Sequence, residues 1–527
     1  MEDGTRLATD VYLPEGAEPP YPTIYVSTTY GRSGIKGPAQ RFCREGYAVV
    51  AQDVRGMGKS EGDDAVIFHH HGWAKNHDGH DTIRWIVSQP WSDGVVGTYG
   101  GSALGITQNM MAPGAPENLK AQHVLVAFSD MYDQCIYQGG VLRKQMMEGW
   151  LAANRIVEGN LDVFRAHPSR DEFWDELSPE SHAEQVNTPG MFVGGWYDIF
   201  LQGSINSFTS IHTHGGPGAR GKCRLIVGPW AHGTFNELKY PANSNLGGLE
   251  AADDLRFFDY HLRGAENGTA DAPAVQYYVM GDPTDPDAPG NVWRSADNWP
   301  PPADEVSYYF HTDGTMSTAK PTSGDALSYK YDPGNPVPTT GGQNLILPKG
   351  PMDQRKIEGR DDVLLFTTDV LEAPLEVTGR LTGVLYVSSD CPDTDFTVKL
   401  TDVYPDGRSM LVTDGILRAR YHDSFKEPSL LEAGKVYELH VDLWSTSLIF
   451  NKGHRIRVAI SSSNFPRFET NPNTGKPIGE AEPRLATNKL YVSAEHPSHM
   501  ELPIFAGPQE VASKYRLATF AATVPIP

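Results

Sequence analysis

The sequence predicts a mostly parallel, doubly wound α/β sheet with an inserted helical segment, followed by an antiparallel β-sandwich. Residues 20–130 alternate short apolar runs with segments of helical periodicity, the pattern of a parallel sheet covered on both faces. From 134 to about 184 the strand pattern disappears, and apolar residues recur at helical spacing. Towards the C-terminus apolar and charged residues alternate, as at 454–460, which is typical of antiparallel strands.

These patterns divide the chain into four segments. We expect a first α/β part at 1–133, a helical cap at 134–186, a second α/β part at 187–300 and a β-domain at 301–527. The stretch 281–304, rich in proline, aspartate and glycine, is the predicted linker before the β-domain. With 527 residues, the chain exceeds what one hydrophobic core serves, so several domains are expected.

Composition excludes some classes of partner. The chain has 66 acidic and 44 basic residues and a formal charge of −22, which disfavours binding to nucleic acid. No apolar run reaches the roughly 18 residues of a membrane span, so a soluble protein without membrane contact is expected. The four cysteines lie far apart and form no metal or redox motif. No signal peptide is visible, but Asp3-Gly4 resembles a hairpin turn without its first strand, so localisation stays open between cytoplasmic and secreted.

A glycine-flanked serine stands where a strand pattern meets a helix pattern. The run 95–99 is largely apolar, Ser102 follows two glycines, and the residues after it can form a helix. A strand that turns sharply into a helix strains the backbone at the turn, and glycines around it leave the necessary room. This pattern is typical of a nucleophile elbow, which exposes a serine hydroxyl at the carboxyl edge of a sheet. An ordinary strand-to-helix turn is the alternative.

An aspartate and a histidine follow Ser102 in the order that a serine, acid and histidine triad needs. The buried strand pattern at 190–195 precedes Asp198, and the one at 224–228 precedes His232, so both side chains fall where loops leave strand ends. Imidazole can accept the serine proton, and a carboxylate fixes its tautomer. Taken singly, Asp198 could cap a helix and His232 could be a loop residue. The order of all three favours catalysis.

Several motifs, spread over nearly the whole chain, resemble one family. They are Asp-Gly-Thr-Arg-Leu at 3–7, Gln-Asp-Val-Arg-Gly at 52–56, Gln-Pro-Trp-Ser-Asp-Gly at 89–94, the elbow, Gly-Trp-Tyr-Asp at 195–198, Gly-Pro-Trp-Ala-His at 228–232 and Asp-Thr-Asp-Phe at 393–396. The chain resembles the hydrolases grouped with cocaine esterase, α-amino acid ester hydrolases and X-Pro dipeptidyl peptidases (CocE/NonD and peptidase S15). The resemblance implies an α/β-hydrolase fold with a cap and a C-terminal jelly roll.

The resemblance also assigns an oxyanion hole. It implies that the Tyr30 hydroxyl donates a hydrogen bond beside the amide of Ala103, the residue after the nucleophile. The position of Tyr30 in the sequence is consistent with this role. It follows the strand pattern at 23–26, and the loops after such strands build the oxyanion hole in α/β-hydrolases. A half-buried tyrosine that only satisfies backbone groups is the alternative. The family usually carries tyrosine at the position of Ala103, so the smaller side chain predicts a wider pocket beside the nucleophile.

Four further side chains are candidates for substrate binding. Asp130 and Asp133 follow the strand pattern at 124–127 and lead into the cap, where one or both could face the acyl pocket. A helix cap plus a surface charge is the equally supported alternative. The other two candidates are Trp150, in the cap, and Trp230, in the histidine motif.

A histidine cluster also suggests a metal site. It consists of His69, His70, His71, His77 and His80, with Asp78 and Asp81 among them. The spacing matches no recognised zinc motif, and an unspaced triplet cannot aim three rings at one ion. We therefore expect no metal here, but a loop whose imidazoles pack near the site entrance.

Together these residues predict a serine hydrolase that cleaves carboxylic esters through an acyl-enzyme and needs no cofactor. Ser102 attacks, His232 acts as base and then acid, and Asp198 orients the imidazole. The expected partner is a small-molecule ester or amide, and the chain could form a homo-oligomer. The alternatives are an X-Pro dipeptidyl aminopeptidase, an α-amino acid ester hydrolase or a β-lactam acylase. A non-catalytic carbohydrate-binding protein is disfavoured because the triad is intact.

Overall fold

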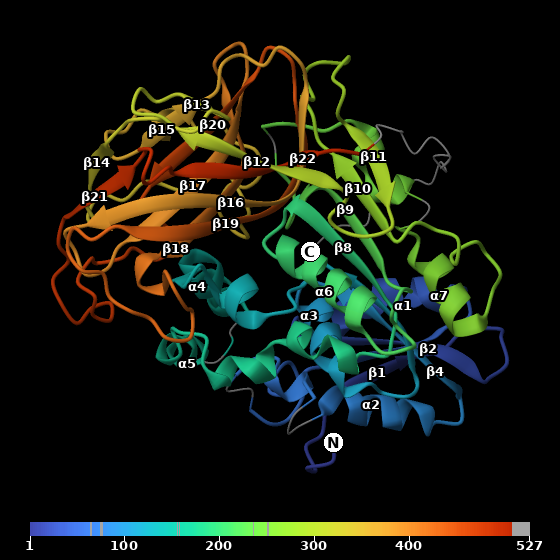
Figure 1. Cartoon of the computed structure of the whole chain (residues 1–527). Coiled ribbons are helices and arrows are strands. Elements are labelled where there is room, and N and C mark those ends of the chain that lie inside the picture. Colours follow the sequence, from blue (N-terminus) through green and yellow to red (C-terminus); the bar gives the residue numbers. More distant parts are fainter. Residues whose placement is uncertain are drawn as a thin grey trace.

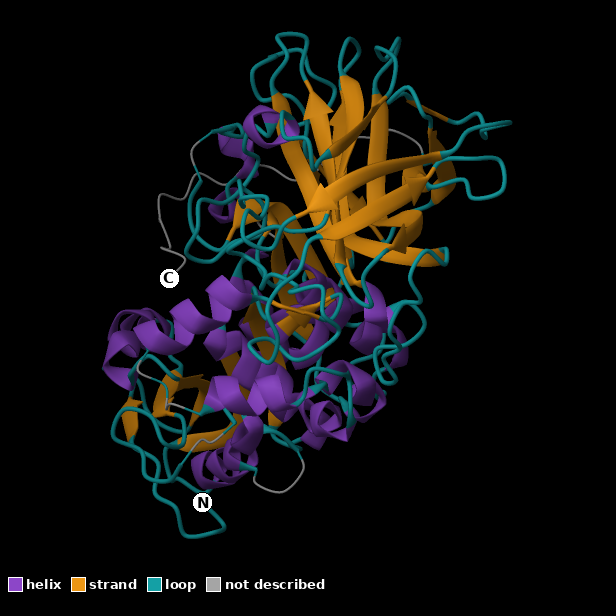
Figure 2. Ribbon diagram, turned by 90° about the vertical axis from the view of Figure 1, so that its left-hand side faces the viewer, coloured by secondary structure: helices purple, strands orange, loops and turns teal. Residues whose placement is uncertain are grey.

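The fold has two parts, an α/β-hydrolase sheet and a β-sandwich, as the sequence predicted (Figure 1). The structure is a computed structural model that describes residues 1–63, 66–73, 77–154, 156, 159–235, 237–249 and 252–507. Figure 2 shows most of the helices around the strands of the lower part and the long strands of the sandwich above them. The predicted β-domain range includes residues 508–527, which lie outside the described residues.

Among the described residues, nine strands form the sheet of the first part. They are β1 (Thr9–Tyr12), β2 (Tyr21–Thr28), β3 (Ala48–Asp53), β4 (Ser92–Gly101), β5 (Leu119–Leu125), β8 (Gly190–Tyr197), β9 (Arg224–Ala231), β10 (Val275–Val279) and β11 (Val292–Ala296). Their order is β1-β3-β2-β4-β5-β8-β9-β10-β11. The neighbouring strands from β3 to β10 in this order are parallel, and the edge strands β1 and β11 run antiparallel to their neighbours. The carboxyl ends of β2, β4, β8 and β9 therefore meet at one edge of the sheet.

Helices cover both faces of this sheet. On one face lie α1 (Lys36–Arg44) and α7 (Asp254–Arg263), where the rings of Phe42 and Phe258 meet edge to face with centroids 5.9 Å apart. The other face carries α2 (Asp78–Val87), α3 (Ala103–Met111) and α6 (Leu201–His214). Burial on both faces explains why the central strands are apolar throughout rather than alternating.

The stretch predicted as a linker contributes a strand to the sheet. Within 281–304, β11 pairs antiparallel with β10, from Val279 opposite Val292 to Val275 opposite Ala296. The linker prediction is therefore wrong for 292–296. Proline, aspartate and glycine on both sides of the strand dominate the composition of the stretch and concealed it.

The chain between β5 and β8 forms a largely helical insertion, residues 132–186. It contains a π-helical turn (Tyr132–Ile136), α4 (Lys144–Ala153), α5 (Asn160–Ala166), two 3₁₀ stretches (Glu172–Leu177 and Pro179–Gln185) and a hairpin of β6 (Tyr137–Gln138) and β7 (Val141–Leu142). The hairpin corrects the expectation that strands are absent here. Gly139 lies in the turn of this hairpin and has a φ of 54°. A Cβ at this position would lie 1.8 Å from the carbonyl oxygen of Ile416. The insertion therefore packs tightly against the sandwich.

In the described part of the β-domain, two antiparallel sheets form the sandwich. The larger sheet contains β12 (Ala303–Phe310), β13 (Met316–Ser317), β14 (Ala326–Tyr331), β16 (Leu375–Ser389), β19 (Tyr437–Phe450), β21 (Ala486–Tyr491) and β22 (His499–Phe505). The smaller sheet contains β15 (Leu364–Thr367), β17 (Asp395–Val403), β18 (Ser409–Arg418) and β20 (Arg455–Ser461), and a short helix, α8 (Arg355–Glu358), precedes β15.

One hydrophobic core connects the first sheet, the insertion and the sandwich. It runs from Phe192 in the first sheet through Trp174 in the insertion to Leu443 in the sandwich, and all three side chains are almost fully buried. Burial of this kind stabilises the arrangement of the parts as well as each part. Among the described residues, none of the helices combines the length and the apolar composition that a membrane crossing requires.

Candidate active site

Ser102 lies in a strained turn between β4 and α3. Its φ is 56° and its ψ is −128°, and its amide donates a hydrogen bond of 3.0 Å to the carbonyl oxygen of Leu125. A backbone conformation of this kind costs about 1–3 kcal/mol of free energy and persists only where the surrounding structure enforces it. Two glycines make the turn fit: a Cβ on Gly100 would lie 2.5 Å from the Cβ of Leu104, and one on Gly105 would lie 2.9 Å from the Leu125 carbonyl oxygen.

The side chains of Ser102, His232 and Asp198 form a continuous chain of hydrogen bonds. The Ser102 hydroxyl lies 3.0 Å from His232 Nε2, and His232 Nδ1 lies 2.8 Å from Asp198 Oδ2. A carboxylate can only accept, so the proton of the neutral ring resides on Nδ1 and Nε2 is free to accept from the serine. All three residues are buried. Asp198 Oδ1 also accepts from the Phe200 amide at 2.7 Å, which fixes the orientation of the carboxylate.

Two hydrogen-bond donors lie beside the serine. The Tyr30 hydroxyl oxygen lies 3.5 Å from Ser102 Oγ. Ala103 is the first residue of α3, so its amide has no acceptor within the helix. Asp53, at the end of β3, holds the loop that carries Tyr30, because its carboxylate accepts from the backbone amide of Arg32 and from its guanidinium, both at 2.6 Å.

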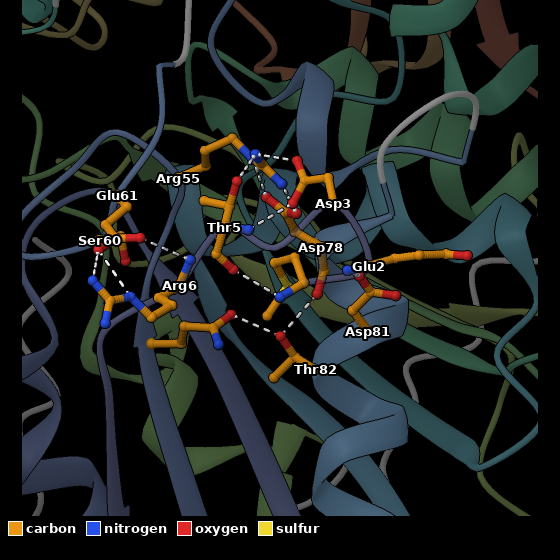
Figure 3. A network of polar contacts seen from close by, with 12 residues as sticks. Glu2, Asp3, Thr5, Arg6, Arg55, Ser60, Glu61, Asp78, Asp81 and Thr82 are labelled. Carbon is orange, nitrogen blue, oxygen red and sulfur yellow. Dashed lines mark hydrogen bonds and ion pairs between the residues drawn. The ribbon is translucent and has the colours of Figure 1, made fainter.

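The loop after β3 is fastened by a second polar network, shown in Figure 3. Arg55 donates to Asp78 at 2.9 and 2.6 Å, at the start of α2, and to Asp3 at 2.7 Å. The guanidinium is buried, so these pairs satisfy a charge that burial alone would destabilise. The motif at 52–56 therefore holds the loop that carries Tyr30, through Asp53, and ties the loop after β3 to the start of α2, through Arg55.

The two candidate tryptophans lie in different surroundings. Trp150, in α4, donates from Nε1 to the Tyr30 hydroxyl oxygen at 3.2 Å and stacks on Phe68. An indole N–H can only donate, so this bond leaves the Tyr30 proton free to point elsewhere. Trp230 instead donates to the carbonyl oxygen of Ser244 at 3.0 Å and packs against Trp293. The structure thus brings Trp150, but not Trp230, to the residues around Ser102.

The two candidate aspartates face the inside of the insertion and the sandwich. Asp130 is buried, pairs with Arg170, and accepts from Ser178 Oγ at 2.7 Å and from the Asp133 amide at 2.9 Å. Burial raises the pKa of Asp133 to about 7, and the charge of Asp442 in β19 adds to the effect. Asp130 therefore has the contacts of a residue that caps a helical turn. Asp133, in contrast, changes its charge near neutral pH.

The histidine cluster does not converge on one point. His71 is buried against Tyr25, and burial lowers its pKa to about 4. His69 instead contacts Glu176 in the insertion, at 2.5 Å from Nε2 to the carboxylate. Within the described part of the chain, no group of three or more histidine, cysteine, aspartate or glutamate side chains is arranged to hold a metal ion.

Two basic residues that the sequence did not single out hold the loops that carry Asp198 and His232. Arg143 is fully buried and donates to the carbonyl oxygen of Ile199, next to Asp198, at 3.0 Å. Burial lowers the pKa of this guanidinium to about 9. Lys349, in the sandwich part, donates to the carbonyl oxygen of His232 at 2.7 Å. Neither residue belongs to a motif, and only the fold brings them to the site.

Comparison with known proteins places the chain in a family. The family model of the X-Pro dipeptidyl-peptidase (S15 family) matches residues 3–160 and 158–234. The family model of the X-Pro dipeptidyl-peptidase C-terminal non-catalytic domain matches residues 267–501. Cocaine esterase of Rhodococcus sp. (strain MB1 Bresler) is 35% identical, over 96% of this chain and 97% of its own length. The chain belongs to the cocaine esterase and S15 hydrolase family.

Other members of this family resemble the chain over almost its whole length. A putative serine esterase of Mycobacterium bovis is 26% identical over 96% of this chain and 94% of its own. Among solved structures, an aminopeptidase from a marine sediment Thaumarchaeota archaeon and an α-amino acid ester hydrolase are each 26% identical, with TM-scores of 0.81 and 0.79. Each alignment covers 96% of this chain and 95% of the other. The chain is a serine hydrolase, and both esterases and peptidases occur among its relatives.

Proposed function

We propose that the protein is a serine esterase in which Ser102, His232 and Asp198 are the catalytic triad. The observation that carries the proposal is the unbroken hydrogen-bond chain from Ser102 Oγ through His232 to Asp198, at 3.0 and 2.8 Å, on a strained elbow. A buried serine in this arrangement can lose its proton to the imidazole as it attacks a carbonyl carbon.

The reaction proceeds through two tetrahedral intermediates. Ser102 Oγ forms a bond to the ester carbonyl carbon while its proton moves to His232 Nε2. The Tyr30 hydroxyl and the Ala103 amide donate to the oxyanion that forms. His232 then protonates the departing alcohol, and the acyl group stays on Ser102. Water repeats these steps, with its proton passing through His232, and releases the carboxylic acid.

Simple short-chain or aromatic carboxylic esters are the proposed substrates. The 35% identity to cocaine esterase over nearly both chains supports an ester rather than a peptide. Asp130, the more deeply buried of the two aspartates, is occupied by Arg170 and Ser178, which leaves it poorly suited to bind a free amino group. We therefore expect X-Pro amides to be cut poorly.

A comparison of three substrates tests this choice. We expect kcat/KM for a p-nitrophenyl acyl ester to exceed that for a Gly-Pro anilide by at least about 100-fold, and to match or exceed that for the corresponding α-amino ester. Fast anilide cleavage would instead make the protein a peptidase. A preference for the amino ester that disappears in Asp133→Asn would make it an α-amino acid ester hydrolase, with Asp133 as the group that binds the ammonium.

Replacement of Tyr30 by phenylalanine tests the proposed oxyanion hole. We expect Tyr30→Phe to lower kcat by about 100-fold to 1,000-fold, the usual effect of removing one oxyanion donor, with little change in KM. Tyr260→Phe, in α7 on the face of the sheet away from α3, is the matched control and should behave as the wild type. Unchanged turnover in Tyr30→Phe would mean that another group serves the oxyanion.

A further inference from the structure

A loop of the sandwich part reaches the backbone of the proposed catalytic histidine. We call this loop, residues 341–350, the strap. Lys349 Nζ donates to the carbonyl oxygen of His232 at 2.7 Å and to that of Leu345, in the strap itself, at 2.5 Å. One ammonium group thus joins the strap to the loop after β9. Burial lowers the pKa of Lys349, while the charge of Asp198 opposes this shift.

The strap is internally braced. Gly342 and Gly350 exchange backbone hydrogen bonds of 2.9 and 3.0 Å, which close the loop. The side-chain amide of Asn344 donates to the carbonyl oxygens of Gly341 and Pro348, both at 2.8 Å. A loop closed in this way holds its lysine in a defined place, because few backbone torsions remain free.

The strap is also anchored to the sandwich sheets through buried side chains. Arg467, which is buried, donates to Asp414 in β18 at 2.7 Å and to the side-chain oxygen of Gln343 at 3.1 Å. The side-chain amide of Gln343 donates to the carbonyl oxygen of Trp196, near the end of β8, at 3.4 Å. The position of the strap is therefore set by the sandwich and by the strand that precedes Asp198.

The strap lies close to helix α4 and to the loop after β9. A Cβ on Gly149, in α4, would lie 2.4 Å from Ile346, and a Cβ on Gly350 would lie 2.5 Å from the Phe235 ring. Gly233, directly after the histidine, has φ of 106°, and a Cβ there would lie 3.4 Å from Lys349 Nζ. These glycines leave room for the neighbouring side chains, and Lys349 fits closely against the peptide that follows His232.

We propose that Lys349 is a positioning residue through which the sandwich sets the orientation of His232. This inference rests on the proposed function. Asp198 and Ser102 contact the two nitrogens of the imidazole, but the direction of the ring also depends on the backbone that carries it. Lys349 fixes that backbone by holding the His232 carbonyl. A shift of about 1 Å in a catalytic group can lower the rate by about 100-fold.

Replacement of Lys349 by methionine tests the proposal. Methionine keeps most of the aliphatic stem and removes the donor, so we expect Lys349→Met to lower kcat by about 10-fold to 100-fold with KM changed by less than about 2-fold. Lys349→Arg, which keeps a cationic donor, should recover most of kcat. Lys356→Met, at an exposed position in α8, is the matched control and should equal the wild type. A raised KM with unchanged kcat would show a substrate contact instead and overturn the proposal.

A double-mutant cycle separates positioning of His232 from a general effect on folding. In a His232→Ala background, we expect Lys349→Met to cause no further loss in hydrolysis of an activated ester, since the group it positions is gone. Equal losses in both backgrounds would overturn the proposal. If Lys349→Met does not fold, Lys349→Leu, which also removes the donor, takes its place with the same criteria. Wild-type protein without esterase activity would contradict the proposed function, whereas active wild type with a fully active Lys349→Met would contradict only this inference.

Discussion

Ser102→Ala is expected to lower ester hydrolysis by about 10⁵-fold to 10⁶-fold, the largest effect of any single substitution in the site. Alanine keeps the Cβ at the strained turn and removes only the oxygen that attacks the carbonyl. The melting temperature should therefore stay within a few degrees of that of the wild type. The measurement is kcat for a p-nitrophenyl ester, corrected for the uncatalysed rate.

A serine elsewhere provides the control for this substitution. Ser88, at the end of α2, is exposed, and Ser88→Ala should keep full activity. Hydrolysis by Ser102→Ala that stays within about 10-fold of the wild type would show that a different group is the nucleophile.

Asp198→Asn is expected to lower kcat by about 10⁴-fold, as the loss of the correct histidine tautomer does in serine proteases. The structure gives the reason. The Phe200 amide donates to Asp198 Oδ1 at 2.7 Å, so the oxygen of the new side-chain amide takes that position and its NH₂ group faces His232 Nδ1. The ring then carries its proton on Nε2, which can no longer accept from Ser102.

The chain contains a matched control for this substitution. Asp171 accepts from His167 Nδ1 at 2.7 Å and from the Phe173 amide at 3.1 Å, which are the same contacts on an exposed surface of the insertion. Asp171→Asn should leave kcat unchanged. A fall in kcat of less than about 10-fold in Asp198→Asn would contradict the proposed role of the carboxylate.

The sequence predicted the elements whose signals are local. The glycines around Ser102 mark a turn that only they can accommodate, and Asp198 and His232 each follow an apolar run long enough for a buried strand. Parallel pairing of β8 with β9 then brings both strand ends to one edge. Fold class and triad candidates could therefore be read from short segments and their order.

Features that depend on contacts between distant segments could not be predicted. Lys349 lies 117 residues from His232 in the chain and belongs to no motif. The strand β11 is short and lies among turn-forming residues, so composition indicated a linker. The hairpin of β6 and β7 has only two residues in each strand and forms against the sandwich, where Gly139 meets Ile416. In each case tertiary packing, rather than local preference, decides the structure.

Mass spectrometry after treatment with a fluorophosphonate tests whether Ser102 is an activated nucleophile, because the reagent requires an activated serine but not the natural substrate. We predict one adduct per chain, on the peptide that contains Ser102, no adduct in Ser102→Ala, and slow labelling in Asp198→Asn. Folded wild-type protein that remains unlabelled, or that is labelled at another serine, would show that Ser102 is not the nucleophile.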